Sequence, residues 1–184
     1  MNVYFTASLA AKQQYIQHYQ QIVDTLKKHK CSVIADHIFQ ATESSIKLQT
    51  RQERLDFHNK LEHWISDSDC VVVEASFPSI SVGYEISMAL HRGKPVLVLY
   101  SEGDPPSLLA YHADEKIVCE RYTKETLSDL ISEFIGFVKG SSDTRFTFFI
   151  TPKIAAYLEK KAKDEKLPKS VYLRKLIEAD MHTR

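Results

Sequence analysis

Cysteine is scarce in this 184-residue chain, which has three, Cys31, Cys70 and Cys119. They lie far apart, each inside or beside an apolar stretch. An odd number without paired spacing does not predict a disulfide framework, so we expect buried, reduced thiols. Neither these cysteines nor the eight scattered histidines have the spacing of a zinc site, and we predict no metal.

Long apolar runs are also absent, and the N-terminus lacks a basic region followed by an apolar core. A membrane helix needs about 20 apolar residues, and a signal peptide needs both N-terminal features. We therefore expect a cytoplasmic protein without membrane contact. With only 5 glycines and 6 prolines, 43% hydrophobic and 26% charged residues, the composition is typical of a globular protein.

The net charge is zero, but the charges are unevenly distributed. Residues 1–138 carry 13 Lys/Arg against 18 Asp/Glu, whereas residues 139–184 carry 11 against 6. This asymmetry indicates two functional units. We predict a main domain over residues 1–139, a polar linker over 140–144 and a small unit over 145–184.

Short apolar strands alternate with amphipathic helices along the main domain. The sequence pattern predicts strands at 2–6, 31–34, 69–73, 95–100 and 116–119, and helices at 11–28, 51–66, 82–92 and 126–138. Gly93 follows the third helix in the usual position of a left-handed cap. Residues 40–50 have no apolar period and are expected to form a loop or lid. This alternation predicts a doubly wound α/β fold with a five-stranded parallel sheet of the flavodoxin or Rossmann kind.

The stretch from Asp69 to Glu85 is typical of a strand, a turn and the start of a helix. Ligands bind at the carboxyl ends of the strands in such sheets. Glu85, beside Gly83 near the amino end of a helix, would be kept ionised by free backbone amides and the helix dipole, available as a nucleophile. The alternative is an ordinary acidic residue that only stabilises the helix.

Hydroxyl and imidazole donors follow several of the predicted strands. They are Ser8, His37, Ser79, Ser81 and Ser107. Each serine alone is typical of a turn. Together with a helix N-terminus, they predict an anion-binding site without a glycine-rich loop.

Three segments resemble the nucleoside 2-deoxyribosyltransferase superfamily, and most of all its 2'-deoxynucleoside 5'-phosphate N-hydrolase branch. They are 3–8, 69–85 and 93–97, and the most specific part is Pro78-Ser-Ile-Ser-Val-Gly-Tyr-Glu85. The similarity covers residues 2 to about 137. It implies an enzyme without metal or cofactor that acts on a deoxynucleotide.

The resemblance also implies roles for individual residues. Glu85 would attack the anomeric carbon of deoxyribose, and Tyr4 would orient it. Ser8, Ser79 and, across a homodimer interface, Ser107 would bind the phosphate, with His37 near the substrate. An N-glycosidic bond breaks through an oxocarbenium-like state that a carboxylate stabilises and can trap. The phosphate contacts favour hydrolysis of 2'-deoxynucleoside 5'-monophosphates over a transferase acting on free nucleosides.

The sequence departs from the family where a general acid should protonate the leaving base. Ungapped alignment puts Leu61 at this position, and leucine cannot donate a proton. The substitutes are Glu62, which projects about 100° further around the helix, and His58, nearly one turn earlier. Ala7 and Ser81 stand where the family has glycine and would narrow the phosphate pocket. A regulator that senses nucleotides without catalysis is therefore the alternative.

The C-terminal unit is similar to a ribbon-helix-helix. Residues 145–150 are a predicted strand, and helices are expected at 152–165 and from 167 onward. About 40 residues of this kind cannot bury a core alone, so the unit needs a partner. Such units dimerise and bind DNA through the ribbon. The outward face would carry Arg145, Thr147 and Phe149, a weak surface for reading DNA, so we favour oligomerisation over DNA binding.

Overall fold

The computed structural model describes residues 1–41, 50–103, 106, 109, 116–140, 150–164 and 169–181. The chain divides into two compact units, Met1–Asp143 and Thr144–Arg184. Each unit is described by itself. In the described part of the chain, no helix is both long and apolar enough to cross a membrane.

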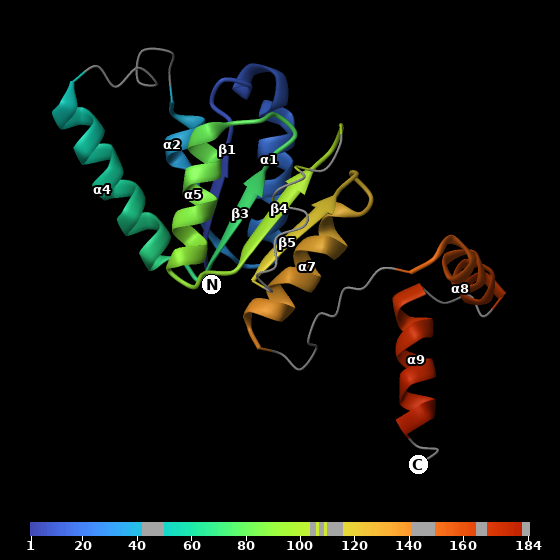
Figure 1. Cartoon of the computed structure of the whole chain (residues 1–184). Coiled ribbons are helices and arrows are strands. Elements are labelled where there is room, and N and C mark those ends of the chain that lie inside the picture. Colours follow the sequence, from blue (N-terminus) through green and yellow to red (C-terminus); the bar gives the residue numbers. More distant parts are fainter. Residues whose placement is uncertain are drawn as a thin grey trace. The chain divides into compact units, whose positions relative to one another are not determined.

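The first unit is built on a five-stranded parallel sheet, which confirms the predicted α/β fold (Figure 1). Its strand order is β2-β1-β3-β4-β5. The strands are β1 (Asn2–Ala7), β2 (Ser32–Ile34), β3 (Cys70–Glu74), β4 (Val96–Tyr100) and β5 (Ile117–Arg121). Ala7, Glu74 and Leu99 are register partners, so the three central strands end at the same edge of the sheet.

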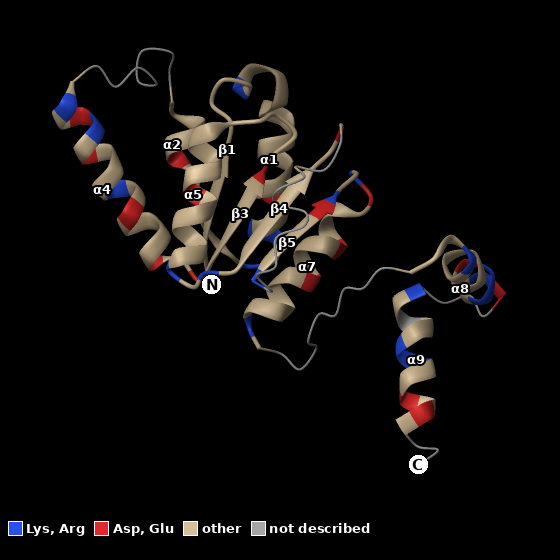
Figure 2. Ribbon diagram, viewed as in Figure 1, with Lys and Arg blue, Asp and Glu red and all other residues tan. Residues whose placement is uncertain are grey.

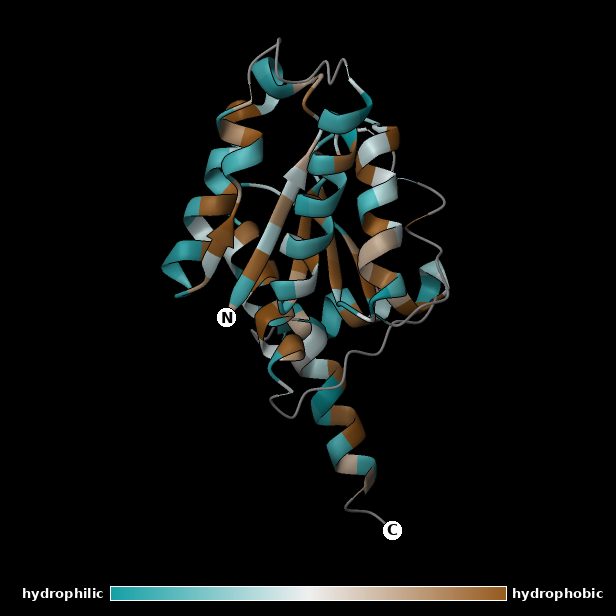
Figure 3. Ribbon diagram, turned by 90° about the vertical axis from the view of Figure 1, so that its left-hand side faces the viewer, coloured by the Kyte–Doolittle hydropathy of each residue, from teal (hydrophilic) through white to brown (hydrophobic). Residues whose placement is uncertain are grey.

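Helices cover both faces of the sheet. On one face α1 (Lys12–Lys28) and α7 (Leu127–Val138) pack against Val3, Phe5 and Val72. On the other face α4 (Arg51–Asp67) and α5 (Ile80–His91) pack against Tyr4, Val71 and Val73. The continuous apolar run of β3 is therefore buried on both faces, as expected for a central parallel strand. Figure 3 shows mostly hydrophobic strands between helices of mixed polarity.

Local chemistry explains where α4 and α5 begin and end. A capping box opens α4, because Thr50 Oγ1 accepts from the Glu53 N–H and the Glu53 carboxylate accepts from the Thr50 N–H. Ser79 caps α5 by accepting from the Val82 N–H. Gly93 follows α5 with φ of 71°, in the left-handed conformation that the sequence predicted.

Several bounds in the first unit differ from the sequence prediction by one or two residues, and β5 ends at Arg121 rather than at residue 119. Helix α5 begins at Ile80 rather than at residue 82, because Ser79 supplies the cap. Ile80 is 95% exposed, so no apolar pattern marked this first turn. A four-residue helix, α2 (Asp36–Phe39), also follows β2. Such a helix is too short to show a period of 3.6 residues.

The second unit contains α8 (Pro152–Asp164) and α9 (Lys169–Met181). These helices bury Leu158, Ala162 and Tyr172 between them. The predicted strand at 145–150 lies, except for its last residue, outside the described residues. Most of the predicted linker (141–144) and of the predicted loop (42–49) also lies outside them.

Candidate active site

Tyr4 and Glu85 meet at the carboxyl end of the sheet. Tyr4 projects from β1 toward α5, and its hydroxyl donates to Glu85 Oε2 over 3.0 Å. Both side chains are buried, with exposed fractions of 0% and 7%. Glu85 lies in the second turn of α5, beyond the free amides of the first turn. The helix amides therefore do not stabilise its carboxylate as we expected, and Tyr4 is the hydrogen-bond donor instead.

Burial dominates the electrostatics of Glu85. Removal from water raises the pKa of the Glu85 carboxyl, whereas the hydroxyls of Thr6 and Tyr4 lower it. Thr6 Oγ1 is close enough to have this effect but does not form a hydrogen bond of ordinary geometry. The carboxylate is thus poorly solvated and is oriented by a phenol, which suits a nucleophile.

His37 lies on the other side of the Tyr4 hydroxyl, with Nε2 at 2.9 Å from Tyr4 Oη. Its ring lies against both Tyr4 and Trp64, with both centroid distances at 5.0 Å. Burial lowers the pKa of His37 to about 4, so the ring is neutral at pH 7. Because the Tyr4 proton goes to the Glu85 carboxylate, Nε2 of His37 must donate to Tyr4 Oη. Its Nδ1 is then an acceptor, and it has no partner among the described residues.

Two buried hydroxyls, on β1 and directly after it, have no hydrogen-bond partner among the described residues. They belong to Thr6 and Ser8, each 1% exposed. Thr6 is two positions beyond Tyr4 on β1 and so points to the same face of the sheet. Buried unsatisfied hydroxyls require an explanation, and a bound ligand is one. Sequence reasoning found Ser8 but missed Thr6, although counting by twos from Tyr4 would have found it.

The remaining predicted phosphate contacts differ in their surroundings. Ser79 Oγ accepts from the Val82 N–H and keeps its own proton free to donate. Ser81 is exposed in the first turn of α5. A Cβ added at Gly83 would meet no atom within 4 Å, so the helix backbone is open there. Ser107 lies outside the described residues.

The position expected for the general acid and its two possible substitutes all lie on α4, but in different surroundings. Leu61 is 4% exposed and belongs to the apolar cluster around Tyr4. Glu62 Oε1 lies 2.8 Å from Arg92 Nη2, and this hydrogen bond lowers the pKa of the Glu62 carboxyl. His58 Nε2 lies 2.8 Å from the hydroxyl of Tyr84, the residue before Glu85. Glu62 is thus held as a carboxylate, whereas His58 contacts the segment that carries the nucleophile candidate.

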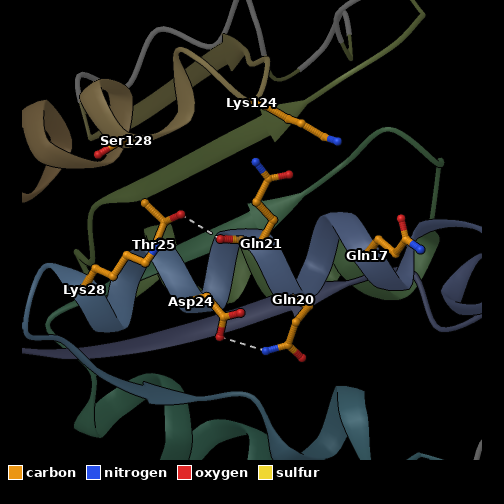
Figure 4. Close-up of a pocket in the computed structure, with 8 residues that line it drawn as sticks. All are labelled: Gln17, Gln20, Gln21, Asp24, Thr25, Lys28, Lys124 and Ser128. Carbon is orange, nitrogen blue, oxygen red and sulfur yellow. Dashed lines mark hydrogen bonds between the residues drawn. The ribbon is translucent and has the colours of Figure 1, made fainter.

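A polar groove lies away from this site, against α1 (Figure 4). Its lining residues are Gln17, Gln20, Gln21, Asp24, Thr25, Lys28, Lys124 and Ser128. Thr25 and Gln20 make hydrogen bonds to their own helix, to Gln21 O and Asp24 Oδ1. Nothing there resembles a catalytic group. Within the described ranges, no cluster of three His, Cys, Asp or Glu could hold a metal ion.

Several known proteins are similar to the first unit of this chain. The family model for nucleoside 2-deoxyribosyltransferases matches residues 3–139. The 5-hydroxymethyl-dUMP N-hydrolase of Esox lucius is 32% identical over 111 residues, covering 60% of this chain and 76% of that protein. A protein of Syntrophotalea carbinolica, provisionally named 2'-deoxynucleoside 5'-phosphate N-hydrolase 1, is 31% identical over 140 residues, covering 71% and 89%.

One solved structure, of Clostridium botulinum CMP N-glycosidase, also aligns with this chain. It covers 71% of this chain and 98% of its own length at 16% identity, with a TM-score of 0.49. At that score we draw nothing from the likeness.

The Tyr4 hydrogen bond can be tested through the titration of Glu85. Because this bond lowers the pKa of Glu85, Tyr4→Phe should raise that pKa further. The side-chain carboxyl carbon of Glu85, followed by NMR against pH, reports the value directly. As a control, Tyr122→Phe removes a buried phenol that contacts Glu74 instead and should leave Glu85 unchanged. An unchanged or lower pKa in Tyr4→Phe would contradict the assignment.

Proposed function

Because the chain belongs to the nucleoside 2-deoxyribosyltransferase family, we propose that it is an N-glycosidase that cleaves the base from 2'-deoxynucleoside 5'-monophosphates. The names of its relatives support this substrate class. The observation that carries the proposal is the buried Glu85 carboxylate, oriented by Tyr4 and near the hydroxyl of Thr6, which has no hydrogen-bond partner among the described residues.

Glu85 acts as the nucleophile. One carboxylate oxygen attacks C1' of the deoxyribose while the bond to the base nitrogen breaks, and the base leaves with the bonding electrons and a proton. This step leaves a 2-deoxyribosyl 5-phosphate ester on Glu85. Water then attacks C1' and gives one proton to the group that protonated the base, which releases 2-deoxyribose 5-phosphate and the free carboxylate. Since Tyr4 donates to Oε2, Oε1 is the oxygen that attacks.

Ser8 and Ser79 bind the 5'-phosphate, together with Ser107 of a second subunit. Ser8 has a buried hydroxyl to offer, and Ser79 keeps a free proton while it caps α5. His37 Nδ1 accepts a hydrogen bond from a sugar hydroxyl. A transferase would use a second base in place of water, and the phosphate donors favour the monophosphate hydrolase.

Base release gives the direct test of the nucleophile. The protein incubated with each deoxynucleoside monophosphate should release free base, measured by chromatography. Glu85→Gln and Glu85→Ala should lower the rate on the order of 10⁴-fold, because the covalent step is lost. Glu62→Gln is the matched control on a carboxylate that is already paired with Arg92 and should keep most of the activity.

Retained activity in folded Glu85→Ala would rule out Glu85 as the nucleophile. The second candidate function is a nucleotide-sensing regulator, and buried Leu61 at the acid position favours it. If calorimetry shows tight nucleotide binding but no monophosphate releases its base, the regulator hypothesis would replace the enzyme hypothesis.

His58 is the general acid that we propose in place of the missing aspartate. The contact between His58 Nε2 and the Tyr84 hydroxyl connects it to the segment that carries Glu85. His58→Gln should lower kcat by about 10²-fold and remove the basic limb of the pH profile, because the leaving base is no longer protonated. Glu62→Gln should leave that limb in place. The reverse result, with the limb lost only in Glu62→Gln, would assign the acid to Glu62.

The unit Thr144–Arg184 serves oligomerisation in our proposal. Its two helices bury three side chains but leave a larger apolar set 44–71% exposed, namely Ile154, Tyr157, Leu176, Ile177 and Met181. This surface suits a second copy of the unit, which would make the protein a homodimer or higher oligomer. Basic residues prevail on α8 (Figure 2), so DNA binding through this unit is the alternative.

Sedimentation measures the role of this unit. Ile177→Glu should shift the protein toward a smaller species, because a charge is placed in the apolar contact. Lys160→Glu introduces the same charge at an exposed polar position of α8 and should change nothing. An unchanged mass in Ile177→Glu, together with a gel shift on DNA at near-physiological salt, would favour DNA binding instead.

A further inference from the structure

A second buried carboxylate, Glu74, lies on the opposite face of the sheet from Glu85. It is the last residue of β3 and only 1% exposed. Alternation along β3 points Glu74 to the same side as Cys70 and Val72, toward α1 and α7. The proposed mechanism does not use it. A carboxyl in such a place is costly unless hydroxyls or amides satisfy it.

Hydroxyl groups from three strand ends converge on Glu74. Its Oε1 accepts a short hydrogen bond from the Ser76 hydroxyl and a longer one, at 3.4 Å, from the hydroxyl of Tyr122. Ser76 Oγ in turn accepts from the Ser101 N–H over 2.8 Å and lies 3.0 Å from Ser101 Oγ. Through Ser76, Glu74 therefore connects the turn after β3 to the turn after β4.

Tyrosines of α1 hold neighbouring turns on the same side of the sheet. The Tyr15 hydroxyl donates to Glu102 Oε1, and the Tyr19 hydroxyl donates to the carbonyl oxygen of Ser8 over 2.9 Å. The backbone of Ser8 is thus fixed from the α1 side while its hydroxyl stays unpartnered among the described residues. Because this bond holds the turn from the α1 side, the Ser8 hydroxyl remains available to a ligand.

Several neighbouring groups act on the pKa of Glu74. Burial raises the pKa of the Glu74 carboxyl, the bonds from Ser76 and Tyr122 lower it, and nearby Glu102 raises it. The other titratable groups that face it come from α1, where Tyr19 and Tyr15 interact with its charge. A glutamine could keep the acceptor oxygen that Ser76 needs, which makes a conservative test available.

We propose that Glu74 is a positioning residue that, through Ser76 and its bonds to Ser101, holds the turn after β3 in the place from which Ser79 binds the substrate phosphate. This inference rests on the proposed function. Ser79 follows Ser76 by three residues and caps α5, the helix that carries Glu85. A purely structural Glu74 would change stability alone, whereas a positioning residue changes phosphate binding in the folded protein.

Calorimetry in a Glu85→Gln background measures binding without turnover. The probes are a 2'-deoxynucleoside 5'-monophosphate and the matching deoxynucleoside, which lacks the phosphate. Glu74→Ala and Ser76→Ala should each weaken monophosphate binding about tenfold, and the double variant no further, because both break one chain of hydrogen bonds. Glu74→Gln should stay within about twofold, and deoxynucleoside binding should not change.

Thr25→Val is the matched control, because it removes a buried hydroxyl hydrogen bond on α1 without touching either turn. Unchanged monophosphate binding in folded Glu74→Ala and Ser76→Ala would overturn the positioning role. If Glu74→Ala fails to fold, Ser76→Ala alone decides the result. A Glu85→Gln parent that binds none of the monophosphates would instead reject the proposed function, and this inference with it.

Discussion

A carboxylate removed from water needs a hydrogen-bond donor, and this need shapes the centre of the first unit. Glu85 on α5 obtains its donor from Tyr4 on β1, 81 residues away in the chain. The same phenol contacts His37, which aromatic rings enclose and burial keeps neutral. Tyr4 can contact both partners only because β1 lies between β2, which His37 follows, and β3, which α5 follows. The connections between strands change direction at this place in the sheet, where ligands bind in such folds. The fold thus brings Tyr4 and Glu85 into contact, which residues so far apart in the sequence could not achieve locally.

The two faces of the sheet carry different polar groups. Toward α4 and α5 lie the candidate nucleophile, its phenol and the Thr6 hydroxyl, which has no hydrogen-bond partner among the described residues. Toward α1 and α7 lies a hydrogen-bonded group of hydroxyls around Glu74, with no reacting role in the mechanism proposed above. Glu85 is the group that reacts in the proposed mechanism, whereas Glu74 is hydrogen-bonded to the turns that it joins. Leu61 constrains the proposed reaction more than either carboxylate does, because the proton for the leaving base must come from a side chain other than the one at that position.

Much of the fold could be predicted from sequence because its signals are local. The continuous apolar run of β3, the stripe of α1 and the position of Gly93 all appear in the structure where the pattern put them. Helix α2 could not be predicted, since four residues show no period. Glu85 was predicted from its place after a buried strand and Tyr4 from the resemblance, but the raised pKa of Glu85 depends on burial, which no single-sequence pattern encodes. Glu74 was missed because it contacts Tyr122 directly and Ser101 through Ser76, and both are distant in the chain.

The central claim is that Glu85 forms a covalent bond to the sugar. Rapid quenching during turnover of a 2'-deoxynucleoside 5'-monophosphate, followed by mass spectrometry of the digested protein, measures it most directly. We predict that the fragment carrying Glu85 gains the mass of a 2-deoxyribosyl 5-phosphate group and that fragmentation places this group on Glu85 itself. Base release without an adduct at any quench time, or an adduct on another residue, would contradict the account.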